Sequence, residues 1–361
     1  MKKLGLEVSG IINNHPTGIS RYTRRLIDGF LDSSNDDFEF DLLYKWQYRK
    51  KMHMGGYKPE GLEVKWHFKQ LYYPLKPYNL IHSTDTLPIP WGKSKKIYTI
   101  HDLAVLQPHL QMMGFSKKSY IESTRKKFEF IAQKADAVIC VSENTLNDFC
   151  SMFSFQKEKG FITHLGFEIR SYPHLDTQTI LKNLGLNEKS YLLYVGIVTV
   201  RKNHLNMIKA YQASTYFKEI PLVLAGGFST GFEMIAQYVK DNRLEKWVKF
   251  TDYASDEIVH SLYTHAKAFL FPTYYEGFGI PILEAYSYGL PVITSTTGSA
   301  PEISGGFATL CHPESISEIT NAINGVDYFS QEKLTEAKNY ARKFTWETCC
   351  HKTIEVYNQF W

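Results

Sequence analysis

Residues 271–302 read FPTYYEGFGIPILEAYSYGLPVITSTTGSAPE, and they hold the most informative local pattern of the 361-residue chain. Glu276 stands between an apolar run and two glycines, which predicts a loop. Pro281 suits the first turn of a helix, because its missing N–H would have no partner there anyway. The helix carries Glu284 about one turn in and ends where Gly289 follows it. The stretch therefore predicts a glycine loop with one carboxylate, followed by a helix with a second.

The loop before this helix predicts a site for an anion. Its backbone N–H groups, at Gly277, Phe278 and Gly279, would face outward at the positive end of the helix dipole, where phosphate is the typical occupant. Glu284 would then take the two hydroxyls of a ribose, and Glu276 those of a second sugar. For the two glutamates alone, an ordinary loop–helix junction with solvated side chains remains the alternative.

A basic pair follows the apolar strand predicted at YLLYVG, residues 191–196. Arg201 and Lys202 stand at the mouth of the next helix, where positive charge opposes the helix dipole. That local misfit favours a functional interpretation over a solvated cap. Arginine would grip two oxygens of a diphosphate, and lysine would act as a point charge.

The N-terminal half predicts a second parallel sheet, with apolar strands at 3–12, 38–44, 80–82 and 96–100. Ligands of open α/β sheets bind at the carboxyl ends of the strands. Gly18 precedes a predicted helix near such an end, and His101 follows the strand KKIYTI directly. His101 would hydrogen-bond a sugar hydroxyl and present its carbonyl to the reacting carbon. A plain turn and a satisfied polar turn remain the alternatives.

Together these motifs resemble the donor signature of retaining glycosyltransferases of family 4. The resemblance rests on E-x7-E from Glu276 to Glu284, on the following GSAPE, and on the stretches G-x4-RKN, TIHDL and GISRYTRRL. One departure is Tyr288, where family members commonly carry a small residue or cysteine. The resemblance implies an α/β chain with the GT-B fold, in which two Rossmann-like domains place parallel sheets on an interdomain cleft.

The resemblance also implies how the chain is divided. Residues 1–170 would form the acceptor-side domain and 171–340 the donor domain, with a hinge near 168–189. Residues 341–361 would form a helix that crosses back to the N-terminal domain.

By the same resemblance, the chain would move a hexose from a nucleotide-diphosphate sugar to a growing glycan or a polyprenyl-diphosphate-linked acceptor. Mannose from GDP-mannose is favoured, in the assembly of O-antigen and related surface polysaccharides. The catalytic residues would be His101, Glu276, Arg201 and Lys202. The donor-binding residues would be Gly18, Arg201, Lys202, Glu276, Gly277, Phe278, Gly279, Ile280 and Glu284.

Composition narrows the possible functions and partners further. A net charge of +4 is too small to indicate nucleic acid. Five cysteines without metal spacing indicate reduced thiols in a cytoplasmic protein. No Asp-x-Asp stands near the donor strands, so no cofactor and no catalytic metal are expected. Residues 45–76 hold eight lysines and arginines against two glutamates among aromatic side chains, which predicts contact with the inner face of a membrane or with a polyprenyl-diphosphate acceptor. A solvated loop with a few core aromatic residues remains the alternative.

Other functions fit less well. A nicotinamide dehydrogenase needs G-x-G-x-x-G after a strand, and neither GIINNHPTG nor AGGFSTG has that spacing. A glycosidase is disfavoured because the carboxylates flank a phosphate-type site. An epimerase of the GT-B type and a non-catalytic sugar-nucleotide-binding subunit remain alternatives.

Overall fold

The computed structural model describes residues 2–12, 18–32, 38–48, 62, 64–67, 78–87, 89, 92–169 and 172–361. Most of the basic aromatic stretch at 45–76 therefore lies outside the described residues. The chain divides into two compact units. Unit 1 comprises Met1–Leu106, Ser116–Gly166 and Phe344–Trp361, and unit 2 comprises Gln107–Phe115 and Phe167–Lys343.

In the described part of unit 1, seven parallel strands form one sheet in the order β3-β2-β1-β4-β5-β6-β7. They are β1 (Lys2–Glu7), β2 (Phe38–Lys45), β3 (Val64–His67), β4 (Leu80–Ser83), β5 (Lys95–Ile100), β6 (Ala137–Cys140) and β7 (Gly160–Ile162). The central strands β4 and β6 are buried at every residue. Parallel strands covered on both faces read as apolar runs, which explains why the sequence reveals them.

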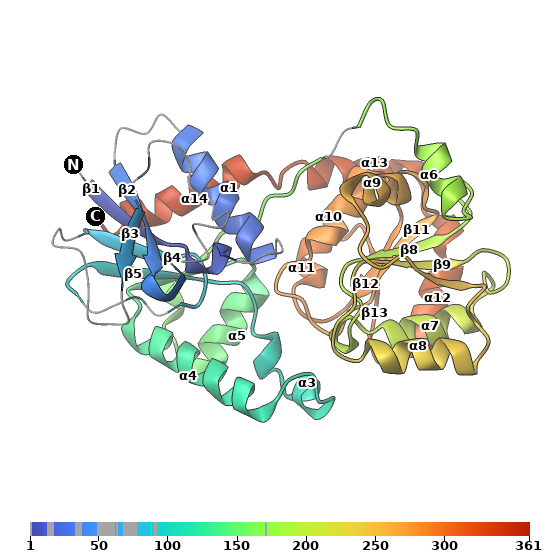
Figure 1. Ribbon diagram of the computed structural model, residues 1–361, viewed down its shortest axis with the longest axis horizontal. Helices are drawn as coiled ribbons and strands as arrows, with labels where there is room; N and C mark the ends of the chain where they lie inside the picture. The colour runs from blue at the N-terminus through green and yellow to red at the C-terminus, as the bar shows by residue number, and fades with distance from the viewer. Residues whose placement is uncertain are drawn as a thin grey trace. The chain divides into compact units, whose positions relative to one another are not determined.

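The helices in the described part of unit 1 cover both faces of that sheet. They are α1 (Gly18–Asp32), α4 (Lys118–Lys134), α5 (Glu143–Phe153) and α14 (Trp346–Asn358). Figure 1 shows α1 and α14 together on one side of the sheet and α4 and α5 on the other. Phe128 of α4 and Phe149 of α5 pack into a core with Tyr98 and Val138 of the sheet.

Unit 2 repeats this architecture over its described residues, with six parallel strands in the order β10-β9-β8-β11-β12-β13. They are β8 (Leu192–Val195), β9 (Leu222–Ala225), β10 (Val248–Phe250), β11 (Ala268–Phe271), β12 (Val292–Ser295) and β13 (Thr309–Cys311). The helices are α3 (Pro108–Met112), α6 (Thr177–Asn183), α7 (His204–Ala213), α8 (Phe232–Asp241), α9 (Asp256–His265), α10 (Ile280–Ser287), α11 (Ala300–Ser304), α12 (Ile316–Asn324) and α13 (Gln331–Ala341). In Figure 1, α9 and α10 lie on one side of the sheet and α7, α8 and α12 on the other.

The α/β class with two parallel sheets is thus confirmed. Unit 1 gives way to unit 2 after residue 166, compared with the predicted boundary at 170, and α14 belongs to unit 1. Residues 107–115 depart from the prediction, because they group with unit 2 although they stand within the predicted N-terminal domain.

Candidate functional site

Glu276, Arg201 and Lys202 meet in unit 2. The Oε1 atom of Glu276 accepts hydrogen bonds from Lys202 Nζ and, at 3.4 Å, from Nη1 of Arg201. Glu276 is only 8% exposed. Burial raises the pKa of this carboxyl, but the charges of Lys202 and Arg201 lower it by more, so the net pKa lies below its ordinary value of 4.5. Glu276 is therefore an ionised carboxylate that accepts hydrogen bonds.

Backbone geometry places the two cations. Arg201 and Lys202 lie in the 3-10 turn Val200–Lys202, which follows β8. Asn203 ends this turn in the left-handed conformation, with φ of 63°, which asparagine tolerates better than most residues. Its buried Nδ2 donates to the carbonyls of Pro272, at 2.8 Å, and Pro313, at 2.6 Å. These two hydrogen bonds fix the turn that carries Arg201 and Lys202 to the backbone that follows β11 and β13.

The loop that carries Glu276 packs against residues 298 and 299, which support it. The buried hydroxyl of Ser299 donates to the carbonyls of Glu276, at 3.0 Å, and Phe278, at 2.7 Å. Gly298 has a φ of +61°, and a Cβ there would lie 2.9 Å from both N and O of Glu276. The GSAPE stretch thus supports the glutamate loop by close backbone contact.

Helix α10 begins where Pro281 predicts it. Gly279 is its N-cap with a φ of 99°, a conformation that favours glycine, and Pro281 lies in its first turn. Gly277, Phe278 and Gly279 are buried, and Ile280, the first helical residue, is half-buried. The amides of this loop therefore lie at the positive end of an eight-residue helix. Their role as an anion site stays a prediction.

Glu284 lies in the middle of α10 and is half-buried. The Tyr263 hydroxyl of α9 donates to its Oε2 at 3.2 Å. Its contact with a ribose stays a prediction.

Gly18 and His101 belong to unit 1. Gly18 is the exposed first residue of α1, and residues 13–17, which precede it, lie outside the described residues. His101 follows β5 directly, its Nε2 donates to the Thr84 carbonyl at 2.9 Å, and its ring meets the edge of Tyr22. That these two residues act on the same donor as Glu276 stays a prediction.

Sequence reasoning missed three supporting residues, namely Asn203, Tyr263 and Ser299. Two of them stand inside motifs that the sequence already singles out, RKN and GSAPE. An asparagine or serine beside a glycine loop is a signal for side-chain bonds to backbone carbonyls. Tyr263 carries no such signal, because its partner Glu284 lies on another helix, 21 residues along the chain.

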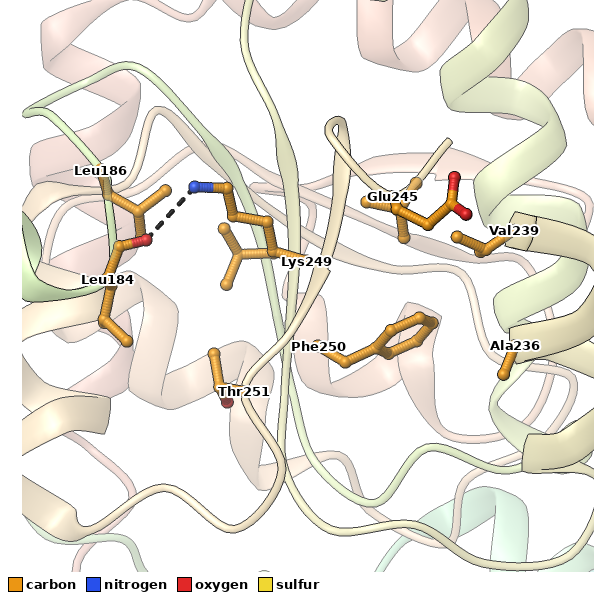
Figure 2. Close-up of a pocket in the computed structure, with 10 residues that line it drawn as sticks. Leu184, Leu186, Ala236, Val239, Glu245, Lys249, Phe250 and Thr251 are labelled. Carbon is orange, nitrogen blue, oxygen red and sulfur yellow. Dashed lines mark hydrogen bonds between the residues drawn. The ribbon is translucent and has the colours of Figure 1, made fainter. Parts of the chain in front are cut away.

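A cavity of about 490 Å³ lies elsewhere in unit 2, beside the edge strand β10. Figure 2 shows Lys249 reaching across it to the Leu184 carbonyl, and its wall also includes Phe250 and Val239. None of the predicted site residues lines it.

Among the described residues, no group of three or more His, Cys, Asp or Glu side chains is placed to hold a metal ion. No helix in the described ranges has the length and apolarity needed to cross a membrane.

Comparison with known proteins shows what the chain is similar to. Residues 176–344 match the model described as glycosyl transferases group 1. This part of the chain is similar to group 1 glycosyltransferases. The chain is 25% identical over 299 residues to O-antigen chain mannosyltransferase B of Escherichia coli, which covers 81% of this chain and 77% of that protein. It is 24% identical over 283 residues to the serotype-specific mannosyltransferase WbdA of Escherichia coli, of which it covers 34%.

Solved structures of glycosyltransferases share the fold of this one. Anabaena Alr3699/HepE, solved in complex with UDP and glucose, matches with a TM-score of 0.73 at 16% identity, over 99% of this chain and 100% of that one. Sucrose-phosphate synthase from Thermosynechococcus elongatus matches with a TM-score of 0.75 at 19% identity, over 99% of both chains. The predicted GT-B fold and the resemblance to glycosyltransferases are confirmed, and this glycosyltransferase moves a sugar.

Proposed function

We propose that this glycosyltransferase is a retaining, metal-independent hexosyltransferase that takes mannose from GDP-mannose and adds it to a growing glycan or a lipid-linked acceptor. The observation that carries the proposal is the cluster in which Arg201 and Lys202 flank the buried carboxylate of Glu276. Each of the three is less than a fifth exposed.

The charges of the cluster favour a diphosphate. Two cations stand beside one carboxylate in a site with little solvent, where charges act strongly on a nearby anion. The amino end of α10 adds partial positive charge next to Glu276. Preorganised charges of this kind stabilise a leaving diphosphate in the transition state. They supply what a divalent cation would otherwise supply, which supports metal independence.

The state of Glu276 supports retention without a protein nucleophile. A carboxylate ion-paired to two cations is a weak nucleophile but a good acceptor for sugar hydroxyls. The leaving phosphate itself would take the proton of the acceptor hydroxyl. Arg201 and Lys202 would hold that phosphate, and Glu276 would orient the sugar.

The choice of mannose rests on similarity to the O-antigen chain mannosyltransferase of Escherichia coli. Alr3699/HepE has been solved with UDP-glucose, so a uridine donor is the main competitor. The acceptor would be a polyprenyl-diphosphate-linked glycan at the inner face of the membrane, reached through the basic stretch at 45–76. Flotation with anionic vesicles tests that contact, and a distribution that does not depend on lipid would remove it.

The test of the proposal is a binding and product panel. GDP-, UDP-, ADP- and dTDP-sugars are screened for a rise in melting temperature, because a ligand of the folded state stabilises it. The nucleotide-sugar that binds is then incubated with acceptor in excess EDTA, and the anomeric configuration of the product is read by NMR. We expect GDP-mannose to bind and an α-linked product to form. Loss of activity that Mg²⁺ restores would overturn metal independence, and an inverted anomer would overturn retention.

The same panel separates the alternatives. An epimerase converts the nucleotide-sugar without acceptor, and a binding subunit gives a thermal shift without any product. Either result, with acceptor fractions of several kinds present, would contradict hexosyl transfer.

A further inference from the structure

Helices α9 and α10 share a row of aromatic contacts that ends on Glu284. Tyr263 of α9 is 1% exposed, and its hydroxyl donates to Glu284 Oε2 at 3.2 Å. A buried phenol needs a hydrogen-bond acceptor, and here that acceptor is a half-buried carboxylate that the donor site would use. The contact therefore limits the directions in which the Glu284 carboxylate points.

Tyr288 holds the ring of Tyr263 in place. The two rings stack with centroids 5.2 Å apart and planes within 7° of parallel. The Tyr288 hydroxyl is 2.8 Å from Nδ1 of His260, and the His260 ring meets the edge of Tyr172 with centroids 5.0 Å apart. Each ring in the row thus has a partner that restricts its rotation.

The spacing along both helices makes this row possible. Glu284 of α10 and Tyr288, the C-cap of that helix, are four residues apart. His260 and Tyr263 are three apart on α9, so each pair lies on one side of its helix. Tyr288 is the position at which this chain departs from the small residue or cysteine expected there. A small side chain at 288 would leave the Tyr263 ring without its stacking partner.

We propose that Tyr263 is a positioning residue that orients the Glu284 carboxylate toward the ribose of the donor nucleotide, and that Tyr288 with His260 holds Tyr263 for this task. The inference rests on the proposed function, in which Glu284 takes the two ribose hydroxyls. With Oε2 held by Tyr263, the carboxylate is ordered before the nucleotide arrives, and less conformational entropy is lost on binding.

The test compares nucleotides with and without the ribose hydroxyls. Dissociation constants of GDP and 2′,3′-dideoxy-GDP, with UDP and 2′,3′-dideoxy-UDP as a second pair, are measured by calorimetry for the whole chain. We expect Tyr263→Phe to weaken binding of the ribonucleotide by roughly tenfold, as for loss of a hydrogen bond to a charged group, and to leave the dideoxy form unchanged. Tyr288→Cys should give the same pattern with a smaller effect.

A matched control is Tyr191→Phe. The Tyr191 hydroxyl is also buried and donates to the Leu262 carbonyl, next to Tyr263 along α9, at 2.7 Å. Its loss should lower the melting temperature without changing the ratio of the two dissociation constants. If wild type prefers the ribonucleotide and Tyr263→Phe keeps that preference, the role of Tyr263 is contradicted and the proposed function still stands. If wild type binds neither GDP nor UDP, the proposed function fails with it.

Discussion

Glu276 lies between two cations, Arg201 and Lys202, and less than a tenth of its surface meets solvent. Desolvation alone would make such a carboxylate costly, but the two charges offset that cost. Glu276 in turn stabilises the two cations, because its negative charge offsets the repulsion between them. Each member of the cluster therefore contributes to stability as well as to the charge of the site.

Glu276→Gln should separate these two contributions. The variant removes the negative charge that Glu276 places between two neighbouring cations, so we expect the free energy of unfolding to fall by about 3 kcal/mol. Turnover should fall by about 10²–10³-fold, the usual effect of removing one preorganised group. Chemical denaturation gives the first quantity, and initial rates at saturating donor give the second.

The double variant Glu276→Gln with Lys202→Met is the control. It removes one of the two facing cations, so most of the lost stability should return while activity stays low. Near-normal rates in Glu276→Gln would contradict the site assignment. Additive destabilisation in the double variant would contradict the electrostatic coupling.

The residues of this cluster could be predicted, but their pairing could not. Arg201, Lys202 and Glu276 each follow a strand of one sheet, and the carboxyl ends of parallel strands share an edge. The sequence alone therefore predicts that the three residues lie near one another. Which oxygen meets which nitrogen depends on side-chain directions set by Asn203 and Ser299, and those contacts span 23 to 110 residues.

At the scale of elements, the glutamate loop is supported by Ser299, a residue outside it. Ser299→Ala removes the donor to the carbonyls of Glu276 and Phe278, which should lower the free energy of unfolding by about 1–3 kcal/mol. We expect the donor to bind less tightly as well, because the Glu276 loop loses its support. Calorimetric titration with the donor nucleotide measures this.

Ser304→Ala is the matched control for that loop. Its hydroxyl is also buried and donates to a backbone carbonyl, that of Pro301 at 3.0 Å, within α11. The variant should lose similar stability and keep normal affinity. Equal loss of affinity in both serine variants would show that the loop responds to stability alone.

The packing of α14 on α1 makes a different prediction. Replacing glycine by alanine inside a helix normally stabilises it by about 1 kcal/mol. At Gly29 of α1, however, a Cβ would lie 2.3 Å from Sγ of Cys350 in α14. We therefore expect Gly29→Ala to lower the melting temperature and Gly29→Ala with Cys350→Ala to restore most of it. A stabilised single variant would contradict this packing.

Strands and helices were predicted best where burial is complete. The strands β4, β6 and β8 read directly from apolar runs. The stretch FITHLGFEI, residues 161–169, is largely apolar, yet β7 ends at Ile162. The reason is visible at Gly166, where a Cβ would lie 2.2 Å from the backbone nitrogen of Trp346. The start of α14 crosses the chain there, and local sequence carries no sign of a crossing 180 residues away.

At the scale of the whole molecule, each unit contains a fully buried histidine. His82 of unit 1 lies between the Tyr357 hydroxyl and Oγ1 of Thr99, and His204 of unit 2 bonds to the Thr199 carbonyl. Burial lowers the pKa of each ring to about 3 from an ordinary 6.5. Both rings are therefore neutral in the folded protein at pH 7.

These two rings predict how stability depends on pH. Below pH 6.5 the unfolded chain binds a proton at each histidine and the folded chain does not, so stability falls as the pH drops from 6.5 toward 3. Each histidine contributes a slope of about 1.4 kcal/mol per pH unit in that range. Urea unfolding at a series of pH values measures the slope.

His82→Gln and His204→Gln test the assignment, because glutamine keeps polar contacts and does not titrate. Each variant should lower the slope of the unfolding free energy against pH by about 1.4 kcal/mol per pH unit, the contribution of one proton. For His82→Gln, this change should appear in the unfolding of unit 1. An unchanged slope in both variants would show that other groups cause the acid dependence.

The membership of α14 in unit 1 also bears on the order of events during synthesis. The ribosome makes every residue of unit 2 from Phe167 to Lys343 before it makes Trp346–Asn358. While it does so, the nascent α1 leaves bare the apolar surface that α14 later covers, and the Tyr357 partner of His82 does not yet exist. Domains generally mature from the amino end as they leave the exit tunnel. In this chain we expect unit 2 to mature first and unit 1 to depend on chaperones until α14 arrives.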